Sequence, residues 1–186
     1  EIRPCISCQE GCMGRIQEYS MLNCAVNPQA ARERATQYNP VCRPKKVMIV
    51  GGGVAGCEAA RVLAIRGHKP ELFEQSSRLG GNLIPGGAPD FKHDDLRLAS
   101  WYENQLNLLK VPVTLNTKVT KEFVKAHDYD VVIVATGSNP KIISLGDDEH
   151  VYTAADVLNK VKDPGERVVI VGGGLVGCET ALWLAR

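Results

Sequence analysis

Hydrophobic and polar positions change period along the middle of the chain. Residues 47–50 are continuously apolar, which predicts a buried strand, and the glycine-rich stretch 51–56 predicts a turn. Helical spacing follows over 57–67, and the stretch 69–74 predicts a second strand. This order is typical of a strand–helix–strand unit with parallel strands.

The alternation continues beyond this unit. We expect a glycine- and proline-rich loop over 76–89, a helix over 94–110 and strands within 111–117 and 129–137. Together these elements predict an α/β fold, a Rossmann-like three-layer parallel sheet.

The chain also contains an internal repeat. Residues 167–186 repeat residues 46–65 almost position for position; because the copies begin at 167 and 46, they lie 121 residues apart. This spacing indicates two nucleotide-binding units rather than a short-period solenoid. We therefore divide the chain into a loop-rich segment with a short helix or two (1–45), a first α/β unit (46–140), a connector with a short helix over 153–161 (141–166) and the start of a second unit (167–186). Because the chain lacks an initial Met and stops inside a helix, we expect a piece of a larger protein.

The amino-acid composition indicates which classes of binding partner to expect. The 186 residues are 44% hydrophobic and 23% charged with a net charge of +1, which is typical of a globular protein and gives no field for nucleic acid or an anionic membrane. No apolar run approaches the roughly 20 residues that span a bilayer, and no signal peptide begins the chain. We expect a cytoplasmic protein that acts on small molecules and uses neither nucleic acid nor membrane.

The glycines of the turn have the spacing of a dinucleotide-binding motif. Gly51 permits a tight turn, Gly53 lets the backbone approach a diphosphate, and Gly56 lets helix and strand pack closely. The amides at the helix N-terminus favour an anion. Glu74, at the end of the second strand, can accept hydrogen bonds from ribose hydroxyls and would repel a 2′-phosphate.

The second copy has the same predicted strand and turn, with Gly172, Gly174 and Gly177 in the turn, although no second strand follows within the chain. Cys57 and Cys178 occupy equivalent helical positions after the third glycine. We expect both to be small buried thiols without a redox role.

Four cysteines near the N-terminus have the spacing CxxCxxxCx(11)C: Cys5, Cys8, Cys12 and Cys24. Three closely spaced thiolates and a more distant fourth suit a 4Fe-4S cluster. Structural zinc is a weaker alternative because paired CxxC motifs are absent and the four histidines lie far away in sequence, and unrelated thiols are a third. Cys42 falls outside the motif and is expected to be a buried or free thiol.

The ordered combination of these motifs with AVNP, RLGG and VVIVATGS resembles the iron-sulfur flavoprotein branch of the old yellow enzyme family, over residues 3–186. The family includes 2,4-dienoyl-CoA reductase, enoate reductases and trimethylamine dehydrogenase. The resemblance implies an FMN-holding TIM barrel before this segment, an FAD domain over 46–140 and an NAD(P) domain beginning at 167.

The resemblance also implies which residues bind these cofactors. The four motif cysteines would bind the 4Fe-4S cluster, and Ala55, Gly56 and Glu74 would hold the FAD diphosphate and ribose. The whole expected cofactor-contacting set is Gly51, Gly53, Val54, Ala55, Gly56, Glu74, Gln75, Gly81, Asn82, Lys92, Val119, Ala135, Thr136, Gly137, Gly172, Gly174 and Gly177.

The implied activity is that of the electron-transfer portion of an NAD(P)H-dependent oxidoreductase. Electrons would pass from NAD(P)H through FAD and the cluster to FMN, which would reduce an activated C=C bond of a small substrate in the barrel. No catalytic acid, base or nucleophile is expected here. Two alternatives are an amine-dehydrogenase-like protein with structural ADP that exports electrons to a partner flavoprotein, and a non-catalytic cofactor-binding fragment. The sequence leaves the oligomeric state open, although apolar faces of partly built sheets would make the chain prone to association into a homo-oligomer.

Overall fold

The computed structural model describes residues 2–144, 146 and 149–186. Its centre is a four-stranded sheet in the order β3-β2-β1-β4, with all neighbouring strands parallel. The strands are β1 (Lys46–Val50), β2 (Lys69–Phe73), β3 (Val113–Thr114) and β4 (Val131–Val134). The predicted α/β fold with a parallel sheet is confirmed.

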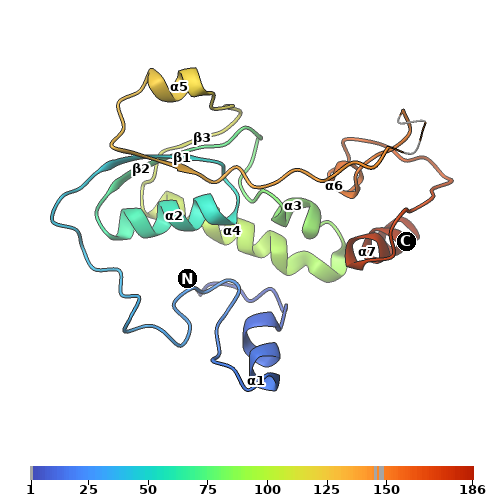
Figure 1. Cartoon of the computed structure of the whole chain (residues 1–186), viewed down its shortest axis with the longest axis horizontal. Helices are drawn as coiled ribbons and strands as arrows, with labels where there is room; N and C mark the ends of the chain where they lie inside the picture. Colours follow the sequence, from blue (N-terminus) through green and yellow to red (C-terminus); the bar gives the residue numbers. More distant parts are fainter. Residues whose placement is uncertain (1, 145, 147–148) are drawn as a thin grey trace.

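Two long helices, α2 (Val54–Ile65) and α4 (His93–Leu108), cover one face of this sheet (Figure 1). Side chains alternate between the faces of a strand. Accordingly, Val47, Ile49 and Leu72 pack with residues of α2 and α4 in one buried cluster. Burying such side chains contributes roughly 1.5–3 kcal/mol each to the stability of the fold. This buried layer therefore holds β1 and β2, and the loops at their carboxyl ends, in place.

The opposite face of the sheet carries a thinner third layer. Phe123 of α5 (Lys121–Lys125) meets the ring of Phe73 edge-on, with centroids 5.3 Å apart. Thr120 caps this short helix by accepting a hydrogen bond from the Phe123 amide at 3.2 Å. Helix α5 is not predicted from the sequence, because five residues are too few to show a helical period.

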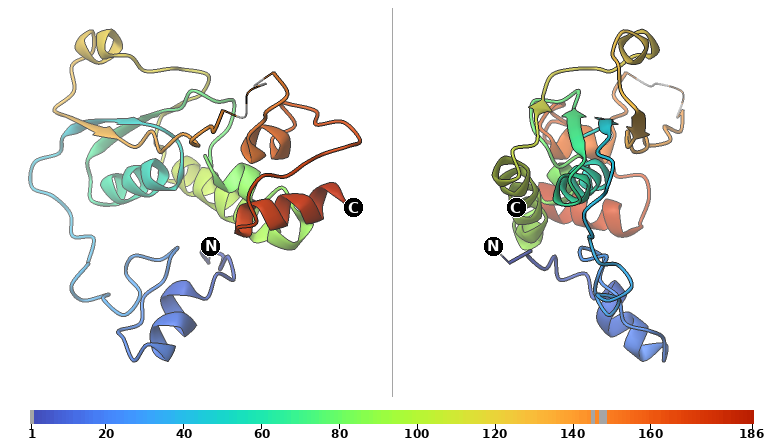
Figure 2. Two further views of the ribbon diagram at one scale, coloured as in Figure 1. Left: turned by 45° about the vertical axis from the view of Figure 1, so that its right-hand side comes forward. Right: turned by 90° about the vertical axis from the view of Figure 1, so that its left-hand side faces the viewer.

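The N-terminal segment extends away from the sheet and returns beneath α2 and α4 (Figure 2). It contains only the π-helical turn η1 (Glu10–Gly14) and α1 (Arg15–Gln17), as expected of a loop-rich region. Residue 1, the first of that predicted region, lies outside the described residues. So do residues 145, 147 and 148 of the predicted connector.

The chain after β4 is mostly irregular in the described residues. It contains α6 (Ala154–Leu158), which the predicted helix over 153–161 anticipates, and α7 (Leu175–Leu184). A Thr153–Asp156 capping box begins α6. The glycine-rich loop before α4 also includes two short turns, α3 (Leu83–Gly86) and η2 (Asp90–Lys92).

Two expectations for the second copy are wrong. Residues 168–173 form no strand, because no described segment supplies the hydrogen-bonding neighbour that a strand needs. Cys178 is exposed rather than buried, because α7 has no sheet to pack against, whereas Cys57 is buried as expected. Cys42 is an exposed free thiol.

Within the part of the chain described, no helix combines the length and apolar character needed to span a membrane.

Candidate functional site

The glycine turn between β1 and α2 has the geometry that the sequence predicts. Gly51 has φ +109°, which strongly favours glycine. A β-carbon on Gly56 would collide with the Gly51 carbonyl oxygen, so helix and turn approach as closely as expected. Val54 and Ala55 begin α2 and are exposed, so the amides of its first turn are open to an anion.

Two loops from distant parts of the sequence flank this turn. Gly80 donates a hydrogen bond to the Gly52 carbonyl at 2.9 Å and pairs with Gly53 in an isolated parallel bridge. Gly81 has φ +54°, and a β-carbon there would lie 3.0 Å from the Gly53 Cα. The RLGG motif thus lies directly against the first glycine motif.

The loop after β4 flanks the other side. Ala135 donates its amide to the Val50 carbonyl at 2.8 Å, and a β-carbon on Gly51 would lie 3.2 Å from the Thr136 Cα. Gly137 follows with φ +72°. The structure therefore brings Ala135 and Thr136 to the glycine turn.

Glu74 lies under the same turn. Its Oε2 accepts a hydrogen bond from the Gly52 amide at 2.5 Å, and its Oε1 accepts one from the Ser76 amide at 2.8 Å. Burial raises the pKa of Glu74, but these backbone hydrogen bonds outweigh it and hold the pKa below its ordinary value of 4.5. A charged carboxylate is thus fixed at the end of β2.

Gly52 and Gly80 are site residues that the sequence reasoning did not single out. A β-carbon on Gly52 would lie 2.5 Å from Leu79 Cδ2 and 3.1 Å from Glu74 Oε2. Both glycines stand inside motifs of consecutive glycines, and that repetition is the signal that could have identified them.

The other predicted contacts lie further out. Gln75 and Asn82 are exposed, and Val119 is half-buried in the loop before α5. Lys92 Nζ forms an ion pair with Glu179 Oε2 of α7 at 2.9 Å. The cofactor contacts of these four residues stay predictions.

The second glycine motif reproduces the local geometry of the first. Gly172 has φ +113°, and a β-carbon on Gly177 would collide with the Gly172 carbonyl oxygen, as Gly56 would with Gly51. Nothing lies within 4 Å of a β-carbon built on Gly172 or Gly174, whereas Gly51 is enclosed by the loop after β4. The turn is formed, but its surroundings are open among the described residues.

The cysteine loop is partly arranged for a metal cluster. The Asn23 amide donates to the Gly11 carbonyl at 2.7 Å, which joins the chain beside Cys24 to the chain beside Cys12. Ser7 donates its amide to Cys5 Sγ at 3.3 Å, the kind of contact that stabilises a thiolate. All four motif cysteines are free thiols. Their donor chemistry fits an iron-sulfur cluster.

The four thiols do not converge in the structure. Among residues 2–144, 146 and 149–186, no three His, Cys, Asp or Glu side chains are grouped closely enough to hold a metal ion. The cluster stays a prediction from the spacing of the cysteines and the closeness of their backbone.

The chain is similar to a known protein family. Residues 45–186 match the model of the pyridine nucleotide-disulphide oxidoreductase family. The chain belongs to that family. Its parallel sheet and glycine turns are therefore those of an FAD/NAD(P)-binding fold.

Individual relatives of this oxidoreductase-family chain are named as reductases and dehydrogenases. It is 54% identical to cinnamate reductase of Clostridium sporogenes over its whole length, which is 28% of that protein. A solved structure of 2-naphthoyl-CoA reductase superimposes with a TM-score of 0.89 at 33% identity, over 97% of this chain and 28% of that one. The structure of histamine dehydrogenase from Rhizobium sp. 4-9 superimposes with a TM-score of 0.76 at 25% identity, over 87% of this chain and 26% of that one.

These comparisons confirm the resemblance to old yellow enzyme-like iron-sulfur flavoproteins. The chain spans less than a third of the relatives it matches.

Proposed function

We propose that this chain is the electron-transfer portion of an NAD(P)H-dependent iron-sulfur flavoprotein that reduces an activated C=C bond. The observation that carries the proposal is the assembled turn, in which three separate glycine-containing segments and Glu74 meet at the carboxyl end of the sheet. Ligands of open α/β sheets bind in this position. The cysteine loop belongs to the same short chain.

In this proposal the residues of this chain bind and orient the cofactors. The open amides of α2 and the turn of Gly51, Gly53 and Gly56 would hold the FAD diphosphate. Glu74 would accept the ribose hydroxyls, and Ala135, Thr136 and Gly137 would border the cofactor. When bound, FAD supplies both hydride acceptance and single-electron release, which suits an intermediary between a nicotinamide and an iron-sulfur centre.

The remaining predicted residues complete the proposed site. Val54, Ala55, Gln75, Gly81, Asn82, Lys92 and Val119 would make further FAD contacts. Gly172, Gly174 and Gly177 would hold NAD(P)H. The substrate and FMN would bind in a TIM barrel that precedes this segment in the whole protein.

The proposed substrate class rests on the relatives. Cinnamate reductase and 2-naphthoyl-CoA reductase are named for an unsaturated acid and an aromatic thioester, and the former is 54% identical to this chain. Histamine dehydrogenase, at 25% identity, supports the amine-oxidising alternative less well.

A binding measurement separates these two candidates. The chain is titrated anaerobically with FAD and, separately, with ADP. Binding of FAD with quenching of its fluorescence is the expected result. Binding of ADP with exclusion of FAD would reject the reductase proposal and favour a structural nucleotide.

The cluster is tested by reconstitution with iron and sulfide. About four iron and four acid-labile sulfide per chain are expected. Replacing Cys12 by Ser should abolish stoichiometric loading, whereas Cys42→Ser, a change to an exposed thiol outside the motif, should not. Stoichiometric zinc without sulfide would contradict the cluster.

A further inference from the structure

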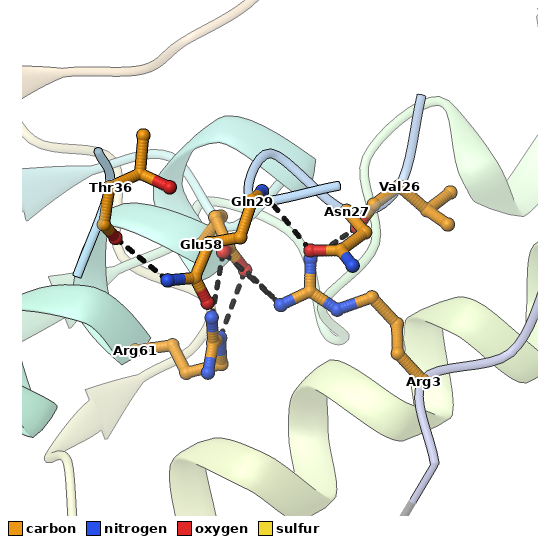
Figure 3. Close-up of polar contacts among 7 residues, drawn as sticks. All are labelled: Arg3, Val26, Asn27, Gln29, Thr36, Glu58 and Arg61. Carbon is orange, nitrogen blue, oxygen red and sulfur yellow. Dashed lines mark hydrogen bonds and ion pairs between the residues drawn. The ribbon is translucent and has the colours of Figure 1, made fainter. Parts of the chain in front are cut away.

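A partly buried ionic network joins the start of the cysteine segment to helix α2 (Figure 3). Arg3 Nη2 donates to Glu58 Oε1 at 3.2 Å and to Oε2 at 3.1 Å. Arg61 donates to the same carboxylate through Nε at 3.0 Å and Nη2 at 2.8 Å. The exposed fractions of the Arg3, Glu58 and Arg61 side chains are 14%, 17% and 10%, so the network is largely shielded from water.

Arg3 also reaches the far end of the cysteine motif. Its Nη1 donates to the Val26 carbonyl oxygen. Arg3 lies two residues before Cys5, Val26 lies two residues after Cys24, and Glu58 lies two residues after Gly56. One guanidinium therefore joins both flanks of the cysteine motif to the helix that begins at the glycine turn.

Neighbouring side chains fix the guanidinium in this place. Its carbon lies 4.5 Å from the centroid of the Trp101 ring on α4, within the range of a cation–π contact. Val26 itself is part of the buried core. Arginine suits this role better than lysine, because its planar fork can serve two acceptors at once.

Two arginines stabilise the charge of the Glu58 carboxylate. Burial raises the pKa of Glu58, but the hydrogen bonds and charges of Arg61 and Arg3 outweigh it and hold the pKa below its ordinary value. Removing Arg3 leaves Glu58 paired with Arg61, so the helix keeps a satisfied carboxylate. The cysteine segment, in contrast, loses its charged link to α2.

We propose that Arg3 is a positioning residue that couples the cysteine cluster to the nucleotide turn, so that occupation of either site changes the affinity of the other. The inference rests on the proposed function, because it requires both a cluster and FAD. Coupling between two binding sites is reciprocal, and typical factors are about 5- to 150-fold.

The test measures the dissociation constant of FAD for the chain with and without its reconstituted cluster. In the unaltered chain we expect the two constants to differ at least about fivefold. In Arg3→Met the ratio should fall to one, and in Arg3→Lys, which keeps the charge but not the fork, it should fall partway. Arg34→Met, at an exposed arginine in the same segment, is the matched control and should retain the full ratio.

Hydrogen exchange of the cluster-free chain gives a second readout. Arg3→Met should speed exchange over residues 5–26 about tenfold or more relative to Arg34→Met, with β2 unchanged. Equal ratios of dissociation constants in the Arg3→Met and Arg34→Met chains, or equal exchange in the two, would overturn the inference. Failure of the unaltered chain to bind FAD or assemble a cluster would instead overturn the proposed function, and the exchange experiment would still show whether Arg3 holds the segment.

Discussion

Glu74 is already ordered by the protein around it. Both carboxylate oxygens accept backbone amides, from Gly52 and from Ser76, so the side chain is held beside the turn without a ligand. Such preorganisation lowers the entropic cost of binding. It also ties the conformation of the glycine turn to the charge of one side chain.

This charge predicts a pH dependence of stability. Because hydrogen bonds hold the pKa of Glu74 below its ordinary value of 4.5 in the folded chain, its contribution to stability is present above pH 4.5 and lost as the pH falls through the folded pKa. Urea unfolding between pH 7 and pH 3 should show the free energy of unfolding falling at the acidic end. Glu74→Gln should flatten that fall.

The exposed Glu103→Gln on α4 is the control for this experiment and should leave the acidic fall unchanged. If Glu74→Gln and Glu103→Gln gave parallel pH profiles, the carboxylate of Glu74 would not contribute in this way.

At the scale of whole elements, α2 and α7 begin with the same sequence pattern but differ in what covers them. Cys57 of α2 is buried under the sheet and contacts the Gly52 carbonyl through Sγ at 3.2 Å, whereas the equivalent Cys178 of α7 is exposed. Burial, with the charges of Glu74 and Glu58, raises the pKa of Cys57 to about 12. A thiol reagent attacks the thiolate, so the two helices should differ in reactivity.

We predict that iodoacetamide at pH 8 modifies Cys178 and leaves Cys57 unmodified in the folded chain. Peptide mass spectrometry after timed quenching measures both sites in one sample, and full labelling in urea is the internal control. Comparable rates at the two cysteines under native conditions would show that α2 is not packed as described.

The sequence predicted most elements because their patterns are local. The run at 47–50, the helix after Gly56 and the acid at the end of β2 each follow from a few neighbouring residues, and the structure confirms all three. The sequence did not predict the bridge between Gly53 and Gly80 or the hydrogen bond from Arg3 to Glu58, because these join residues far apart in the chain. The expected strand in the second copy failed for the same reason, since pairing depends on a partner segment.

Over the whole molecule, apolar side chains remain uncovered around the second glycine motif. The exposed fractions are 88% for Val169, 68% for Val171 and 72% for Leu175. Exposed apolar side chains of this kind favour association. This is the region through which the chain would associate with a second copy.

We therefore expect the chain to self-associate at micromolar concentration and the double change Val169→Lys, Val171→Lys to reduce that association. Sedimentation velocity over a concentration series is the measurement. Val161→Lys replaces a valine of the connector that is 68% exposed and should change little. Association that is equally strong in the double variant would place the interface elsewhere.

The uneven exposure of the four motif cysteines has a practical consequence for the intact chain. Cys5 and Cys8 are exposed, while Cys12 and Cys24 are half-buried. Oxidation of thiols follows their accessibility, and it passes through sulfenic acid to disulfides or to irreversible acids. In air Cys5 and Cys8 would be oxidised before Cys12 and Cys24, so under the proposed cluster assignment aerobic purification would yield a chain that no longer accepts iron and sulfide.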